Sequence, residues 1–97
     1  DYASAIAVLN EVLVASPRNA DAFNLLGYAS RKSGDLDSAA RHYEAALTIN
    51  PNHLGALEYQ GELFIMLGDL AAAEANLTRL AAACGAGEEH AELAAAL

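Results

Sequence analysis

The chain has 97 residues, enough for one small domain, and its 13 acidic and five basic residues give it a net charge of −8. Phosphate groups repel so acidic a surface, which makes nucleic acid and anionic membranes poor partners, and the apolar runs are too short to span a bilayer. Alanine supplies much of the 55% of apolar residues and β-branched residues are few, so the composition favours helices over strands.

Apolar residues recur at helical spacing along the chain. Residues 20–34 predict one helix, which ends at Gly34 because glycine readily adopts a left-handed conformation. Asp35 is expected to cap the next helix, since its carboxylate lies near the free amides of the first turn. That helix ends at Asn50, because the residue before Pro51 is disfavoured in helical geometry. The apolar faces of the two helices carry Phe23, Leu26, Tyr28, Ala29, Ala39, Tyr43, Ala46 and Leu47.

The same plan returns further along the chain, at the spacing that separates Pro17 from Pro51. This offset also pairs Ala22 with Ala56, Gly27 with Gly61, Gly34 with Gly68, Asp35 with Asp69 and Ala39 with Ala73. Residues 17–50 and 51–84 therefore predict two copies of a helix-turn-helix unit. Residues 1–16 match only the second helix of such a unit, and residues 85–97 contain a final capping helix.

Each unit carries a glycine inside its first helix, at Gly27 and Gly61. Glycine in a helix interior costs about 1 kcal/mol relative to alanine, so a physical reason is required. We interpret both glycines as sites where the paired helices approach closely, with Ala39 and Ala73 expected opposite them.

Both ends of the chain carry a further expectation. A repeat cannot bury its apolar face alone, so residues 1–16 predict either a missing first helix upstream or a self-association edge. The edge residues are Ile6, Leu9, Val12 and Leu13. In the final helix, the expected core residues are Ala91, Ala94 and Ala95, and the expected outer residues are Glu88, Glu89 and Glu92.

These residues resemble the tetratricopeptide repeat (TPR). Its slots are filled in the first full unit by Phe23, Leu26, Gly27, Ala39, Tyr43, Ala46 and Pro51, and in the second by Leu57, Gly61, Phe64, Ala73, Leu77 and Leu80. This sequence differs from the TPR pattern at three positions, Ser30, Gln60 and Gly85. The resemblance implies an all-α fold, with a single TPR domain over residues 1–97. In such a fold, antiparallel helix-turn-helix repeats of about 34 residues stack as a right-handed α-solenoid.

The stretch LEYQGELFIMLGDLAAAEANLTRLAAACGAGEEH also resembles the C-terminal part of bacterial TPR proteins, many of them exported. In those proteins a second cysteine often follows the first, whereas none follows Cys84 here. The resemblance therefore supports no disulfide or redox role. It leaves the compartment open between the cytoplasm and the bacterial periplasm.

Few residues have a spacing that suggests chemistry. His42 and His90 have no second ligand at a metal-binding spacing, and His53 is expected to be a solvated loop residue. Cys84, the only cysteine, is expected to be a small buried side chain. No serine stands in an arrangement that suggests a nucleophile. We therefore expect no catalysis, no bound metal and no cofactor.

The resemblance also implies a binding surface, because in TPR proteins the first helix of each unit lines a concave groove. The residues in those positions are Asn24, Tyr28, Arg31, Glu58, Glu62 and Glu92. Chaperone-docking TPR domains hold a carboxylate with lysine and asparagine, and only Asn24 suits that role here. Glu58 and Glu62 are four residues apart, where like charges repel, so a cation between them would relieve the repulsion.

We therefore expect a non-catalytic scaffold that binds a protein or peptide segment bearing lysine, arginine or a free amine. Two alternatives remain open at this point. The acidic residues can be a solvated face only, or the chain can be a module that forms homo-oligomers through its apolar edge helices.

Overall fold

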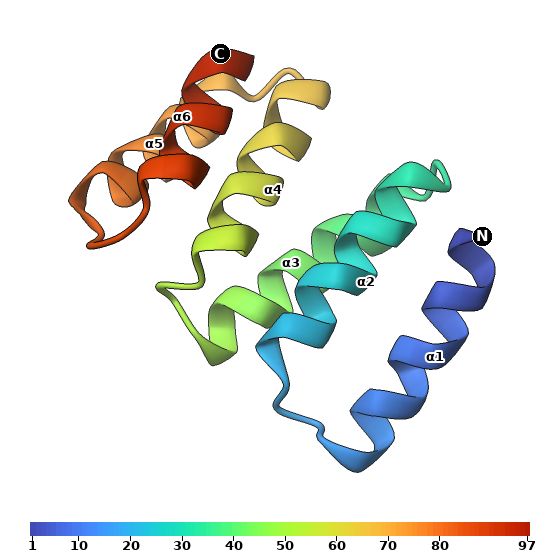
Figure 1. Cartoon of the computed structure of the whole chain (residues 1–97). Coiled ribbons are helices and arrows are strands. Elements are labelled where there is room, and N and C mark those ends of the chain that lie inside the picture. The colour runs from blue at the N-terminus through green and yellow to red at the C-terminus, as the bar shows by residue number, and fades with distance from the viewer. The chain divides into compact units, whose positions relative to one another are not determined.

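The computed structural model describes all residues, 1–97, as six α-helices without a β-strand (Figure 1). The helices are α1 (Tyr2–Ala15), α2 (Ala20–Lys32), α3 (Leu36–Ile49), α4 (Leu54–Met66), α5 (Leu70–Ala82) and α6 (Gly87–Ala96). None of them is both long enough and apolar enough to cross a membrane. The chain divides into two compact units, Asp1–Pro51 and Asn52–Leu97, with three helices each. We call them unit 1 and unit 2.

The turns within the repeats follow from local sequence. Gly34 and Gly68 have φ values of 89° and 80°, so each ends its helix in the predicted left-handed conformation. Asp35 Oδ1 then accepts a hydrogen bond from the Ser38 amide, at 3.1 Å, and thereby caps α3. His53 is a cap as well and not a solvated loop residue, because its Nδ1 accepts a hydrogen bond of 3.0 Å from the Ala56 amide.

In unit 1, α2 packs against both α1 and α3 (Figure 1). Leu26 and Tyr43 are fully buried in this packing. A Cβ atom added to Gly27 would lie 2.5 Å from Cε1 of Tyr43, which confirms that this glycine allows a close approach. The nearest atoms opposite Gly27 belong to Tyr43, whose flat ring fills the space that the absent side chain leaves.

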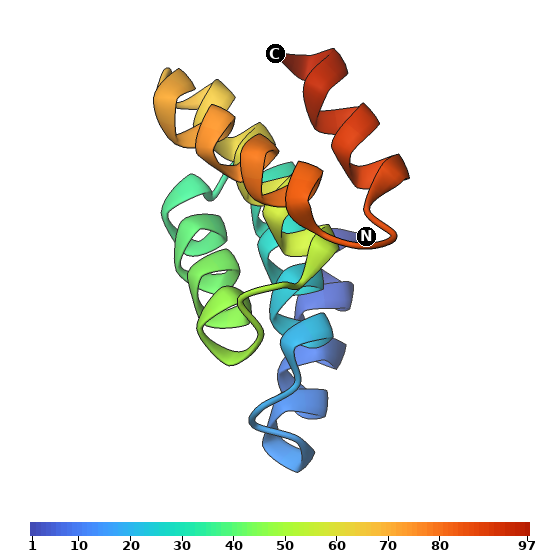
Figure 2. The ribbon, with the colours of Figure 1, turned by 90° about the vertical axis from the view of Figure 1, so that its left-hand side faces the viewer.

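In unit 2, the helices α4, α5 and α6 pack against one another, and Figure 2 shows the loop through which the chain turns from α5 into α6. Leu93 of α6 is fully buried, and a Cβ atom added to Gly61 would lie 2.6 Å from its Cδ2. Gly61 therefore lies against Leu93 of α6. The expected core residues of α6 were wrong, since Ala91, Ala94 and Ala95 are not buried and Leu93 is. One buried leucine side chain removes several apolar groups from water at once, which a single alanine methyl group cannot do.

A buried polar link joins α4 to α5. Asn76 Nδ2 donates hydrogen bonds to the Leu57 carbonyl, at 3.1 Å, and to Oε1 of Gln60, at 2.9 Å. This pair accounts for the departure from the TPR pattern at Gln60, where the pattern has leucine. A buried amide needs such partners, because an unmade hydrogen bond costs about 1–3 kcal/mol.

Replacing Gly27 by alanine is expected to lower the free energy of unfolding by about 1–3 kcal/mol, because the added methyl group overlaps the Tyr43 ring. Helix propensity alone would favour alanine by about 1 kcal/mol. Gly87→Ala is the matched control, since a Cβ atom there meets nothing within 4 Å. Urea denaturation followed by circular dichroism measures both variants. A Gly27→Ala variant as stable as the unmodified protein would contradict the close-approach interpretation.

Candidate functional site

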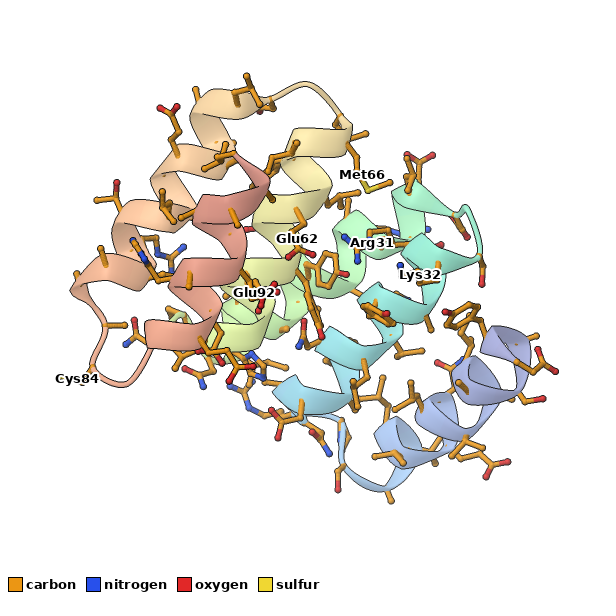
Figure 3. The ribbon with its side chains drawn as sticks, turned by 45° about the horizontal axis from the view of Figure 1, so that its top comes forward. Arg31, Lys32, Glu62, Met66, Cys84 and Glu92 are labelled. Carbon is orange, nitrogen blue, oxygen red and sulfur yellow. The ribbon has the colours of Figure 1, made fainter.

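Four carboxylates gather in unit 2, two from α4 and two from α6. They are Glu58, Glu62, Glu89 and Glu92, and we call this set the acidic cluster. Figure 3 shows Glu62 on α4 and Glu92 on α6. Within each helix the two acids are four or three residues apart, so they lie on one side of it.

The electrostatic effect of the cluster is concentrated on Glu58. The pKa of this half-buried carboxyl is raised from 4.5 to about 8. Burial is the largest cause, followed by a hydrogen bond with Glu62 and by the negative charges of Glu62, Glu92 and Glu89. Glu58 is therefore mostly protonated at neutral pH. A cation placed in the cluster would favour the ionised form and would be attracted by the neighbouring carboxylates.

The binding candidates of unit 1 lie on α2 and have a different character. Arg31 Cζ and Lys32 Nζ lie 5.4 and 5.5 Å from the ring centroid of Tyr28, within the range of cation–π attraction. Asn24 is only 6% exposed, and its Oδ1 atom accepts no hydrogen bond. This acceptor is buried, and the side chain is not the open surface residue that the sequence suggested.

The structure thus brings the predicted site residues together in two sets. Glu58, Glu62 and Glu92 share the acidic cluster of unit 2, while Tyr28 and Arg31 are neighbours in unit 1. Glu89 of α6, whose first-helix position also made it a candidate for the groove, joins the cluster. Its spacing of three residues from Glu92 was the signal in the sequence.

The apolar edge of α1 differs in detail from its prediction. Ile6, Leu9 and Leu13 are half-buried. Val12 is exposed, and so are other large apolar side chains of unit 1, namely Tyr2, Val8, Val14 and Leu25. A surface groove of about 480 Å³ runs between α1 and α2. It is lined by Tyr2, Ser4, Ala5, Val8, Leu9, Leu25, Tyr28 and Ala29. No residue of α1 is fully buried.

Cys84 is exposed, which corrects the expectation of a buried side chain. The reason is that α5 ends at Ala82, so that the cysteine lies in the loop before α6 (Figure 3). His42, by contrast, has a structural role, because its ring lies 6.1 Å from that of Phe23 and burial lowers its pKa. No group of three or more His, Cys, Asp or Glu side chains could hold a metal ion.

Comparison with known proteins identifies the repeat. A family model described as tetratricopeptide repeat matches residues 1–53 and again residues 30–89. The two matches together include parts of both units and extend from α1 into α6. No curated protein matches the sequence significantly.

The raised pKa of Glu58 predicts a pH-dependent stability. Between about pH 4.5 and 8 the folded chain retains a proton that the unfolded chain releases, so the free energy of unfolding falls as the pH rises through this range. Glu58→Gln removes this contribution. Thermal unfolding at pH 5, 7 and 9 should therefore show that the melting temperature of the variant rises relative to that of the unmodified protein as the pH increases. Glu74→Gln, at an exposed position of α5, is the control and should not change the slope.

The exposure of Cys84 predicts rapid labelling of the native protein. A thiol-specific chromophore should react with the folded chain at a rate within about tenfold of that of the urea-unfolded chain, because no opening of the fold is required. Protection by several orders of magnitude would mean that the thiol is buried in solution.

Proposed function

Because the chain belongs to the tetratricopeptide-repeat family, whose repeats generally mediate protein–protein interaction, we propose that it is a non-catalytic module that binds a segment of a partner protein. The bound segment is basic or carries a free amine. It binds at the acidic cluster through lysine, arginine or amino groups that lie between Glu58, Glu62 and Glu92.

The observation that carries this proposal is the crowding of carboxylates around Glu58. Burial and these neighbouring acids raise the pKa of Glu58 to about 8, so the folded state loses stability as the pH rises from about 4.5 to 8. Such a cost is more easily understood if the acids bind a ligand. A bound ammonium or guanidinium group neutralises the repulsion and lowers that pKa. Binding at neutral pH is therefore accompanied by the release of a proton from Glu58.

Repeat register relates two of these acids to one residue of α2 in unit 1. Asn24, Glu58 and Glu92 follow one another at the same spacing as Pro17 and Pro51, so they occupy the same position of three successive first helices. The Oδ1 atom of Asn24 is an acceptor, as the carboxylates are, but it is buried, so the proposed site consists of the acidic cluster of unit 2 alone.

The experiment is a calorimetric titration of the full chain with a synthetic lysine–alanine peptide, beside peptides in which glutamine or glutamate replaces lysine. Only the lysine peptide should bind. Repeating the titration in buffers of different ionisation enthalpy should reveal proton release at pH 7. The double variant Glu58→Gln/Glu62→Gln should bind about 5- to 30-fold more weakly, since the two lost ion pairs together contribute about 1–2 kcal/mol.

A matched control separates the cluster from the net charge. Glu44→Gln/Glu74→Gln removes two exposed acids from α3 and α5, and at pH 7 it removes more negative charge than the cluster variant, in which Glu58 is already mostly protonated. This variant should keep its affinity within about twofold. Equal weakening of both double variants would mean that the overall charge of −8 attracts the peptide, and the proposed site would be wrong.

A further inference from the structure

We propose that His53 is a pH-sensitive cap: in mildly acidic solution its imidazole gains a proton, the cap is lost, and the first turn of α4 loosens. The basis is one hydrogen bond between the ring and the helix backbone, together with its counterpart in unit 1. The inference does not depend on the proposed function, and its tests need no ligand.

The hydrogen bond at the start of α4 requires a neutral ring. His53 Nδ1 accepts a hydrogen bond of 3.0 Å from the Ala56 amide, and the His53 backbone is extended, as is usual for the residue before a helix. An imidazole nitrogen accepts only while it carries no proton, so the neutral ring holds its proton on Nε2. A second proton turns Nδ1 into a donor, and the hydrogen bond from the amide can then no longer form.

Protonation also places a charge at the unfavourable end of the helix. The amides of the first turn give a helix N-terminus a partial positive charge, which repels a cation. The first turn of α4 contains no acidic residue that would offset this repulsion. Acid therefore removes an acceptor and adds a repulsive charge at the same place.

Unit 1 contains the same cap without a titratable group. Asn19 precedes His53 by one repeat, and its Oδ1 accepts a hydrogen bond of 3.0 Å from the amide of Ala22, the equivalent of Ala56. The asparagine side chain carries no charge that depends on pH. The first helices of the two units thus begin with the same hydrogen bond, but only α4 begins with one that acid can break.

The other capping side chains do not respond in this range either. They are the aspartates Asp1, Asp35 and Asp69, at the starts of α1, α3 and α5. Aspartate stays ionised above about pH 5, whereas histidine is the side chain that gains its charge between about pH 5 and 8. Mild acid therefore acts on the cap of α4 and spares the caps of α1, α2, α3 and α5.

Within unit 2, the elements that pack against α4 carry further charged and titratable groups. They are Arg79 near the end of α5, Cys84 in the following loop, Glu88, Glu89, His90 and Glu92 of α6, and Glu58 of α4 itself. Arg79 lines a surface pocket with Asn52 and Leu54, the neighbours of His53, and opposes a further positive charge there, while the glutamates favour it. These charges influence how readily the ring takes up a proton. The requirement that Nδ1 carries none is set by the hydrogen bond.

The loosened turn leads directly to the acidic cluster. Glu58 follows Ala56, whose amide the cap binds, by two residues, and Glu62 lies one turn further along α4. Loss of the cap therefore frees the backbone beside Glu58, and it makes the order of this part of the cluster depend on pH.

The experiment is a titration of the isotope-labelled full chain between about pH 8 and 5, followed by nuclear magnetic resonance. At pH 8 the Nδ1 nitrogen of His53 should have the chemical shift of an acceptor, and the Ala56 amide proton should have the downfield shift of a hydrogen-bonded group. Both signals should then move with one common midpoint as the ring is protonated. The Ala22 amide is the internal control and should not follow.

Two variants exchange the chemistry of the caps. In the unmodified protein, the protection of the Ala56 amide against solvent exchange, corrected for the intrinsic rate at each pH, should fall by about 3- to 30-fold between pH 8 and 5. In His53→Asn it should change by less than about twofold. Asn19→His should transfer the acid sensitivity to the Ala22 amide. Circular dichroism checks that both variants retain their helices.

Three outcomes would overturn the proposal. A proton on Nδ1 of His53 at pH 8 would mean that the ring is a donor and not a cap. An Ala56 amide that does not follow the titration of the ring would mean that the cap survives protonation. An equal loss of protection in His53→Asn would assign the effect to other groups, since that variant retains His42, His90 and Glu58.

Discussion

The contact between the backbone of Gly27 and the ring of Tyr43 sets how closely α2 and α3 can approach. Without a side chain at Gly27, the ring lies directly against the helix backbone, and both residues are buried. The alanines around this contact bury little area each, so the thin core depends on close packing more than on large side chains. Gly61 and Leu93 provide the corresponding contact between α4 and α6 in unit 2.

Small residues occupy the closely packed side of each first helix, and the longer polar side chains therefore lie on its other sides. In unit 2 this places Glu58 and Glu62 of α4 near the acids of α6, where burial and mutual repulsion hold the Glu58 pKa near 8. An arrangement of this kind destabilises the folded state of the free protein at alkaline pH. Natural proteins accept such local costs at functional sites, which is why the acidic cluster is the centre of the proposed function.

The packing of the repeats also explains why equivalent apolar residues differ in their exposure. Each helix of a repeat protein buries its apolar side on its neighbours, so a helix without its usual neighbour exposes residues that are buried elsewhere. Leu25 and Leu93 occupy equivalent positions, yet only Leu93 has a helix over it. The difference between them lies in their surroundings and not in the residues.

Much of the fold was predictable from the sequence, because its signals are local. A glycine that needs a positive φ, an aspartate at the first free amides and a proline after the last turn act within a few residues, and so the helices begin and end near their predicted positions. The constant repeat offset then identified the family. The acids of the candidate site were also predictable, since helical spacing places Glu58 and Glu62 on one side.

What the tertiary structure decided concerns contacts between helices. The sequence could not determine that the Tyr43 ring lies directly against Gly27, or that α6 is buried through Leu93 and not through its alanines. The burial of Asn24 and the exposure of Cys84 also depend on tertiary contacts and could not be predicted from the sequence. Helical periodicity specifies which residues share a side, whereas burial and pKa depend on which helix covers that side. By itself, therefore, the sequence determined the helices, their register and their charges, and only packing determined which residues are covered.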